Sequence, residues 1–285
     1  MTATGEKSVL RVGVLIVDLP KPAADSLRFL VTHTNQLQRS FEFEVWETPK
    51  TDPLVYALRQ TQPIAYCEEF IETIRGFASR QRVRIEDRQA RFKLAGAAPE
   101  HYVIVSLASL SNHFYSSGGR GTTLLTLGSW ERWMAPPSLV EFAHTLILRM
   151  AAGMALPANV RIRHLATRGC LFDFNEYLDT LRLKVLNSLI CSECDGALHA
   201  IGRDAMADDL RLVMDKKWLG KADDPLSPAG ISRKLGYDLY LSKGASPTFL
   251  EGAVTQLRAS WLGELLKVAG VVLAAAFVLI LGLKD

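Results

Sequence analysis

The chain has 285 residues, of which 48% are hydrophobic and 22% are charged, and its formal net charge is +3. This composition excludes an intrinsically disordered chain, because the apolar content is too high for a solvated polymer. It also excludes a disulfide-rich secreted scaffold, since the chain has only four cysteines. The mild positive charge does not indicate direct nucleic-acid binding, so nucleic acid is expected at most as an indirect partner.

Segments with strand and helix periodicity alternate along the first 200 residues. Strands are expected at 9–17, 41–47, 102–108 and 122–128, and helices at 22–39, 64–79, 138–154 and 205–216. The alternation predicts one α/β domain with a mixed sheet over residues 1–203. Two segments that connect these elements also have a recognisable composition: residues 82–94 are basic and residues 116–121 are rich in glycine.

The basic segment at 82–94 alternates polar and apolar residues around Glu86 and Asp87, and it is predicted to form a β-hairpin. Its arginines form either a surface for an acidic partner or the solvated face of that hairpin. The Gly-rich stretch 116–121 lies between two strands and is expected to be a loop.

The end of the chain is its most apolar part. Residues 268–283 contain no charged or strongly polar side chain. Counted from Leu265, the stretch reaches roughly 20 residues, which is enough to cross a hydrocarbon core of ~30 Å. We therefore expect a C-terminal transmembrane helix over 261–285, with a helical linker region over 204–260 before it. A buried core helix is the alternative.

The expected location follows from the two ends of the chain. The N-terminal residues show no signal-peptide pattern, and Lys243, Arg258 and Lys267 precede the apolar tail, in keeping with the positive-inside rule. We expect a single-pass protein of the cytoplasmic membrane with most of the chain in the cytoplasm. The membrane is then one partner, and the tail is a candidate for oligomerisation.

Three of the four cysteines and one histidine lie in one part of the sequence. They are His164, Cys170, Cys191 and Cys194, and the last two form a CxxC pair. A Cys3His set is typical of a closed tetrahedral zinc site, which can supply the cross-link that a reducing cytosol denies to disulfides. The pattern predicts one structural Zn²⁺. A redox CxxC and uncoordinated thiols are the alternatives, and the isolated Cys67 is expected in the core.

The order of features from residue 101 to 194 resembles the archaemetzincins, a family of zinc metallopeptidases. In that family two strands precede an HExxHxxGxxH helix, and C-x4-C-x-M and CxxC motifs follow. Glu141 and His144 match the HExxH motif here, while Val140 replaces its first histidine. The spacing of His164 and Cys170 matches that of the family's third histidine and second cysteine, and a CxxC pair follows.

The resemblance implies a metzincin-like fold and leaves two functions open. A catalytic zinc needs three protein ligands and one open position, and Val140 removes one ligand. Ser138 and Glu141 also fit a capping box, and His144 fits a core histidine among apolar neighbours. We expect a pseudoenzyme without catalytic residues. The alternative is a membrane-bound metallopeptidase with Glu141 as base and with His144 and His164 as zinc ligands.

The expected function is that of a binding or effector protein. A zinc-stabilised cytoplasmic domain held at the bilayer suits the recruitment of a protein partner. It also suits a membrane-perturbing effector that a partner controls. Prokaryotic defence systems use proteins of this layout, so a role in defence is expected by analogy alone.

Overall fold

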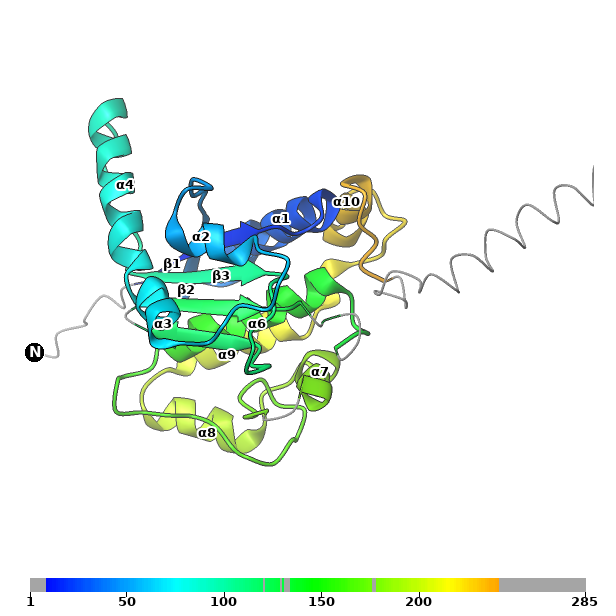
Figure 1. Ribbon diagram of the computed structural model, residues 1–285. Helices are drawn as coiled ribbons and strands as arrows, with labels where there is room; N and C mark the ends of the chain where they lie inside the picture. The colour runs from blue at the N-terminus through cyan, green and yellow to red at the C-terminus, as the bar shows by residue number, and fades with distance from the viewer. Residues whose placement is uncertain (1–8, 120, 129, 131–133, 176–177, 241–285) are drawn as a thin grey trace, which may run out of the picture. The chain divides into compact units, whose positions relative to one another are not determined.

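The computed structural model describes residues 9–240, apart from 120, 129, 131–133 and 176–177 (Figure 1). The strands are β1 (Leu10–Val17), β2 (Phe41–Val45), β3 (His101–Ser106), β4 (Ser116–Gly119) and β5 (Thr122–Thr126). The helices are α1 (Lys21–Leu37), α2 (Pro53–Leu58), α3 (Glu68–Arg75), α4 (Phe77–Phe92), α6 (Leu139–Met154), α7 (Leu178–Asn187), α8 (Ser192–Ala200), α9 (Asp204–Met214), the 3-10 helix η1 (Lys217–Leu219) and α10 (Pro228–Lys234). The predicted mixed α/β class is confirmed.

The five strands form one mixed sheet in the order β2-β1-β3-β5-β4. β1 is parallel to β2 and β3, and β3 is parallel to β5. β4 is antiparallel to β5 and forms the edge, so the prediction of a loop at 116–121 is wrong for its first four residues. Strand pairing needs only backbone groups, which is why a Ser-Gly run without strand propensity can form it.

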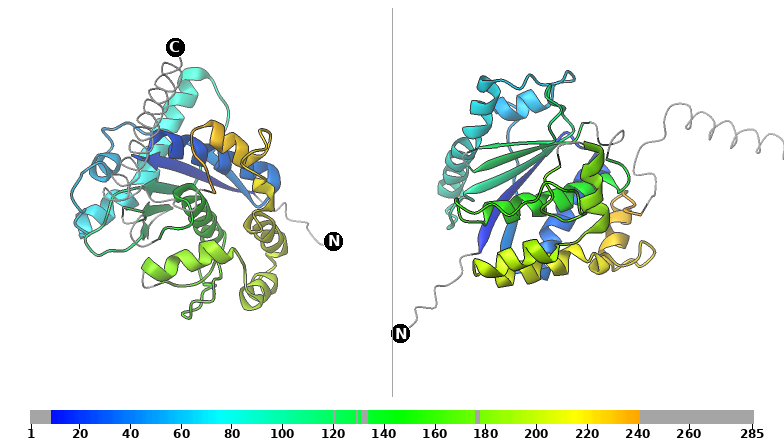
Figure 2. Two further views of the ribbon diagram at one scale, coloured as in Figure 1. Left: turned by 90° about the vertical axis from the view of Figure 1, so that its right-hand side faces the viewer. Right: turned by 90° about the horizontal axis from the view of Figure 1, so that it is seen from below.

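The two faces of the sheet bury different sets of side chains. Along β1, Val12 and Val14 belong to the buried cluster that includes residues of α1 and α6, whereas Leu15 and Val17 belong to the cluster with residues of α2, α3 and α4. This separation follows from the two-residue period of a strand. Figure 2 shows helices on both faces of the sheet. Because both faces are covered, the central strands read as continuous apolar runs in the sequence.

The prediction of a hairpin at 82–94 is wrong, because most of these residues belong to α4. Phe77, Gln81 and Ile85 recur every four residues and are buried, which is a helical and not a strand spacing. Val83 and Phe92, expected on the buried face of a hairpin, are 57% and 61% exposed. Figure 1 shows α4 extending past the edge of the sheet, so its far end has no core to pack against.

The isolated Cys67 is exposed, which contradicts its expected place in the core. It is the N-cap residue of α3, and the helix buries Phe70 and Ile74 from its following turns. An N-cap residue lies outside the first helical turn, so its side chain does not share the buried stripe of the helix.

Residues after 203 continue the same core. The predicted helix at 205–216 is present as α9, and it buries Met206 and Leu210 with the residues of α1 and α6. Leu219 in η1, Ala229 in α10 and Leu239 are buried in the same cluster. Through residue 240, the expected helical linker region therefore packs on the α/β part of the chain.

The predicted transmembrane segment, residues 261–285, lies outside the described residues. Among the helices that are described, none is both long and apolar enough to cross a bilayer. The membrane prediction therefore rests on the sequence of the tail.

Candidate metal centre

The four predicted ligands come from two short segments that follow α6. His164 and Cys170 lie in the irregular stretch between α6 and α7, while Cys191 is the N-cap residue of α8 and Cys194 lies in its first turn. One isolated β-bridge joins His164 to Asp173, and another joins Cys170 to the residues just before α8. The first bridge folds the His164 segment back on itself, and the second brings Cys170 beside the residues that lead into α8.

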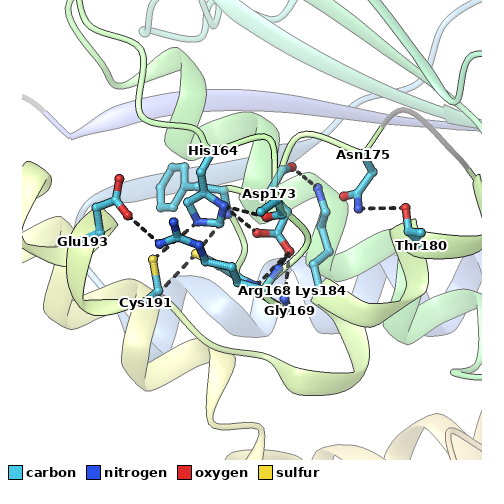
Figure 3. A network of polar contacts seen from close by, with 12 residues as sticks. His164, Arg168, Gly169, Asp173, Asn175, Thr180, Lys184, Cys191 and Glu193 are labelled. Atoms are coloured by element: carbon cyan, nitrogen blue, oxygen red, sulfur yellow. Dashed lines mark hydrogen bonds and ion pairs between the residues drawn. The ribbon is translucent and has the colours of Figure 1, made fainter.

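The structure places the donor atoms of His164, Cys170, Cys191 and Cys194 within 4.8 Å of one another. Cys191 Sγ lies 3.4 Å from His164 Nε2 (Figure 3). Zinc bonds of about 2.3 Å to sulfur and 2.0 Å to nitrogen separate neighbouring ligands of a tetrahedral site by roughly 3.3–3.8 Å. The four residues therefore form a group that could hold a metal ion.

The ring of His164 is oriented by acceptors on the side away from the sulfurs. Its Nδ1 lies 2.9 Å from Asp173 Oδ1 and 3.0 Å from the carbonyl oxygen of Ala166 (Figure 3). With the Ala166 carbonyl as its hydrogen-bond acceptor and the Asp173 carboxylate at ion-pair distance, Nδ1 carries a proton. In the neutral ring, Nε2 then has its lone pair directed toward the cysteines. A carboxylate behind the histidine is the arrangement that fixes metal-binding tautomers in zinc sites.

Asp173 is itself held by a tight backbone turn. Its Oδ2 accepts hydrogen bonds from the backbone N–H groups of Arg168, Gly169 and Cys170 at 2.9, 2.8 and 3.1 Å. Gly169 has φ +73°, and a Cβ there would lie 2.3 Å from the Asn187 amide nitrogen. The turn that presents three donors to one carboxylate oxygen therefore needs glycine at this position.

The sulfur atoms share protons when no metal is bound. Cys170 Sγ accepts N–H groups from Phe172 and Cys191 at 3.5 and 3.3 Å. The hydrogen bond from the Cys194 thiol is the largest cause that lowers the pKa of Cys170 to about 5, against the opposing effect of burial. The same hydrogen bond raises the pKa of Cys194, which keeps its proton. A cation would take the place of that proton.

The imidazole belongs to the same proton-sharing set. Burial acts to lower the pKa of His164, but its hydrogen bonds with Cys170, the Ala166 carbonyl and Cys191 raise it further than burial lowers it. The metal-free cluster is thus an anionic thiolate beside a histidine that binds protons readily. Metal ligation requires both groups to give up protons, so a metal would compete directly with acid for this site.

One buried cation, Lys184, and one partly buried cation, Arg149, lie close to the cluster, and the sequence identified neither. Lys184 is fully buried, its Nζ donates to the carbonyl of Asp173 at 2.7 Å, and burial is the main cause that lowers its pKa to about 7. The guanidinium of Arg149 lies over the ring of Phe172 at 5.1 Å, and burial lowers its pKa as well. Both interact electrostatically with Cys170. In the sequence, nothing distinguishes Lys184 and Arg149 from solvated charged residues of a helix.

Glu141 and His144, the alternative catalytic pair, are not in this group. His144 is buried, its Nε2 lies 2.8 Å from Thr34 Oγ1, and burial is the main cause that lowers its pKa to about 3. Glu141 forms an ion pair with Lys216 at 2.6 Å. Its backbone N–H donates to Ser138 Oγ at 3.3 Å, as expected of the N-cap. Among the described residues, neither side chain joins His164 in a possible metal site.

No protein-family model, no curated protein and no solved structure matches this chain. The resemblance to the archaemetzincins therefore rests on the sequence motifs alone and stays a prediction. The chemistry of the four clustered ligands is the remaining basis for assigning a function.

Proposed function

We propose that His164, Cys170, Cys191 and Cys194 bind one zinc ion in a closed structural site. The observation that carries this proposal is the approach of all four donor atoms to within 4.8 Å. Thiolates and imidazole favour zinc over the hard cations magnesium and calcium. Four protein ligands fill a tetrahedral shell, so such a site has no open position at which to activate water.

The zinc ion would stabilise a part of the chain that has little regular structure. Between α6 and α7 the described residues contain isolated bridges but no helix or extended strand. A metal joining His164 and Cys170 to α8 would cross-link this stretch to the helices that follow it. Because the unfolded chain has no preformed site, the free energy of metal binding becomes folding free energy.

We further propose that the protein is a non-catalytic binding protein held at a membrane by residues 261–285. The apolar run at 268–283 supports the tether, and the closed ligand set supports the absence of catalysis. The described domain would then present a surface to a protein partner at the bilayer. A membrane effector controlled by such a partner is the more specific form of this proposal.

Metal analysis tests the zinc site. The purified full-length protein should contain one zinc per chain, with X-ray absorption distances of about 2.3 Å to sulfur and 2.0 Å to nitrogen. Cys191→Ser should lose the zinc and melt at a lower temperature, whereas Cys67→Ser, at an exposed thiol, should do neither. Absence of bound metal in the parent would contradict the proposal. Two zinc ions per chain would favour the peptidase instead.

Cell fractionation tests the tether. The full-length chain should sediment with membranes and need detergent for extraction. A chain that ends at residue 260 should be soluble, with its zinc and melting temperature retained, because a helix that spans the bilayer has its apolar surface in lipid and packs little on its own soluble domain. A truncated chain that aggregates, while the full-length chain is soluble without detergent, would show that the segment is a core helix.

A further inference from the structure

A cavity of about 500 Å³ lies beside the amino ends of β1 and β2. It is lined from three directions: by Leu10 and Ser40 at the strands, by residues 154–157 at the end of α6, and by Arg203 at the start of α9. Its volume is within the range of small-molecule sites, roughly 300–1,000 Å³. None of the metal-centre residues lines it.

One part of the lining is apolar. Leu10, Met154, Leu156, Pro157 and Met206 contribute to it. Met206 is buried in the core and Leu156 packs against that core, so these side chains are held in place by the fold. They could contact a hydrocarbon or aromatic group of limited size.

The polar part of the lining is cationic. Arg39 and Arg203 both line the cavity, and no ion pair is formed by either guanidinium within the described part of the chain. The only acidic residue of the lining is Asp209, whose Oδ2 accepts the N–H groups of Arg39 and Ser40 and the Ser40 hydroxyl at 3.1, 2.9 and 2.6 Å. Its charge is stabilised locally, and both guanidinium groups remain available.

The backbone at this end of α9 adds to the positive potential. The N-cap residue Arg203 provides no side-chain hydrogen bond to the first turn. Ala205 and Met206, in that turn, both line the cavity. First-turn N–H groups have no acceptor within their own helix, and the helix dipole is positive there. This contribution strengthens a site that the two arginines and the cavity already define.

We infer that the cavity binds a small organic anion. Arg39 and Arg203 would hold its carboxylate or phosphate head, since guanidinium groups pair with these planar or tetrahedral anions through several hydrogen bonds. The apolar lining would contact its body. A neutral molecule would leave the arginines unpaired, and an inorganic ion would leave the apolar lining empty. This inference does not depend on the zinc site or on the tether.

Calorimetric titration of the full-length protein in zwitterionic nanodiscs tests this inference. Phenyl phosphate and hexanoate are the probes, and inorganic phosphate and hexanamide are the comparators. We expect saturable binding of both probes and at least about tenfold weaker binding of both comparators. Equal binding of hexanamide would overturn anion recognition. Equal binding of inorganic phosphate would overturn a role for the apolar lining, and absence of binding by either probe would overturn the site.

Two variants and a matched control locate the binding. Arg39→Gln and Arg203→Gln should each weaken phenyl phosphate binding by on the order of tenfold, because each removes charge-assisted hydrogen bonds. Arg91→Gln removes an exposed arginine from α4, on the other face of the sheet, and should change nothing. Unchanged zinc content and melting temperature would show that the variants are folded. Parent affinity in both folded cavity variants would overturn the assignment.

Anionic nanodiscs identify the source of the ligand. The same titration with phosphatidate in the disc should abolish phenyl phosphate binding if the natural head group belongs to a lipid. Unchanged binding would identify a free small molecule. Either result keeps the anion site, provided that binding in zwitterionic discs depends on Arg39 and Arg203.

Discussion

Replacement of Asp173 by Asn tests whether this carboxylate fixes the metal-binding form of His164. The parent side chain has one oxygen 2.9 Å from His164 Nδ1 and the other bonded to three backbone N–H groups. Asn has nearly the same shape but replaces one oxygen with an NH₂ donor. If its oxygen stays with the three N–H groups, the donor faces Nδ1. The imidazole proton is then favoured on Nε2, the atom that must bind zinc.

The expected loss is large enough to measure. Removal of such a carboxylate behind a ligating histidine typically costs 10–100-fold in metal affinity, or about 1.4–2.7 kcal/mol. At fixed free zinc, the free energy of unfolding falls by the same amount, because zinc stabilises only the folded chain. A neutral oxygen also accepts the three backbone hydrogen bonds more weakly, which brings the expected total to about 2–4 kcal/mol.

Chelator competition and thermal melting measure the two quantities on the same samples. Glu193→Gln is the matched control, since it makes the same carboxyl-to-amide exchange between Cys191 and Cys194. Glu193 is 64% exposed, and its ion pair within the described residues is with the exposed Arg168, so its loss should cost less than about 1 kcal/mol. Parent zinc affinity in folded Asp173→Asn would refute the argument that Asp173 sets the histidine tautomer.

Three further outcomes follow from the described contacts. Folding lowers the pKa of His144 from 6.5 to about 3, so between these pH values the unfolded chain binds a proton that the folded chain does not. The free energy of unfolding should therefore decrease by about 1.4 kcal/mol for each unit by which the pH drops below 6.5. Urea melts of His144→Gln from pH 7 to 5 should lack this slope. Glu141→Gln should cost about 1–3 kcal/mol, because Lys216 loses its carboxylate partner and keeps the Val185 carbonyl, yet it should leave zinc content unchanged. Zinc loss in the folded variant would contradict this. Zinc must displace the Cys194 proton, so chelator titrations should show affinity falling as pH falls, and a flat profile would contradict proton displacement.

The central strands and two long helices were predictable because their burial is visible in the sequence. β1 and β3 are mostly apolar runs, as expected where both faces of a sheet are covered. α6 was predicted with its start at Ser138, since the capping side chain and the apolar pattern agree. Local signals and tertiary packing favour the same structure at these positions.

α4 and β4 could not be predicted because local pattern and packing disagree there. The alternation of Arg82, Val83, Arg84 and Ile85 imitates a strand, but only Ile85 of these four is fully buried. A helix that extends beyond the sheet does not need a complete apolar stripe, so periodicity carries little information in its outer half. β4 forms because its backbone pairs with the edge of β5, and the residues of β4 have no strand propensity that would predict this pairing.

The ligands of the metal centre were predictable, but their surroundings were not. Cysteine and histidine are few in this chain, so their spacing stands out in the sequence. Asp173, Lys184 and Arg149 belong to common charged types, and only the three-dimensional packing shows that they lie beside Cys170. The sequence therefore identifies the four clustered residues that could hold a metal ion and misses the charged side chains that lie beside them.

The buried ammonium of Lys184 offers a test of the charge of the proposed metal centre. A Zn²⁺ ion with three thiolates and a neutral imidazole carries a net charge of −1, whereas the metal-free group shares protons among its sulfurs. Burial lowers the pKa of the Lys184 ammonium to about 7, although the nearby Asp173 and Cys170 act to raise it. Where His164 is protonated, the metal-free group pairs its imidazolium with the Cys170 thiolate and has no net charge, so zinc binding should add one negative charge and raise the pKa of Lys184. Nitrogen NMR of Lys184 in chelated and zinc-replete protein, both still folded, measures the change. An equal or lower pKa with zinc would show that the lysine does not balance the charge of the metal centre.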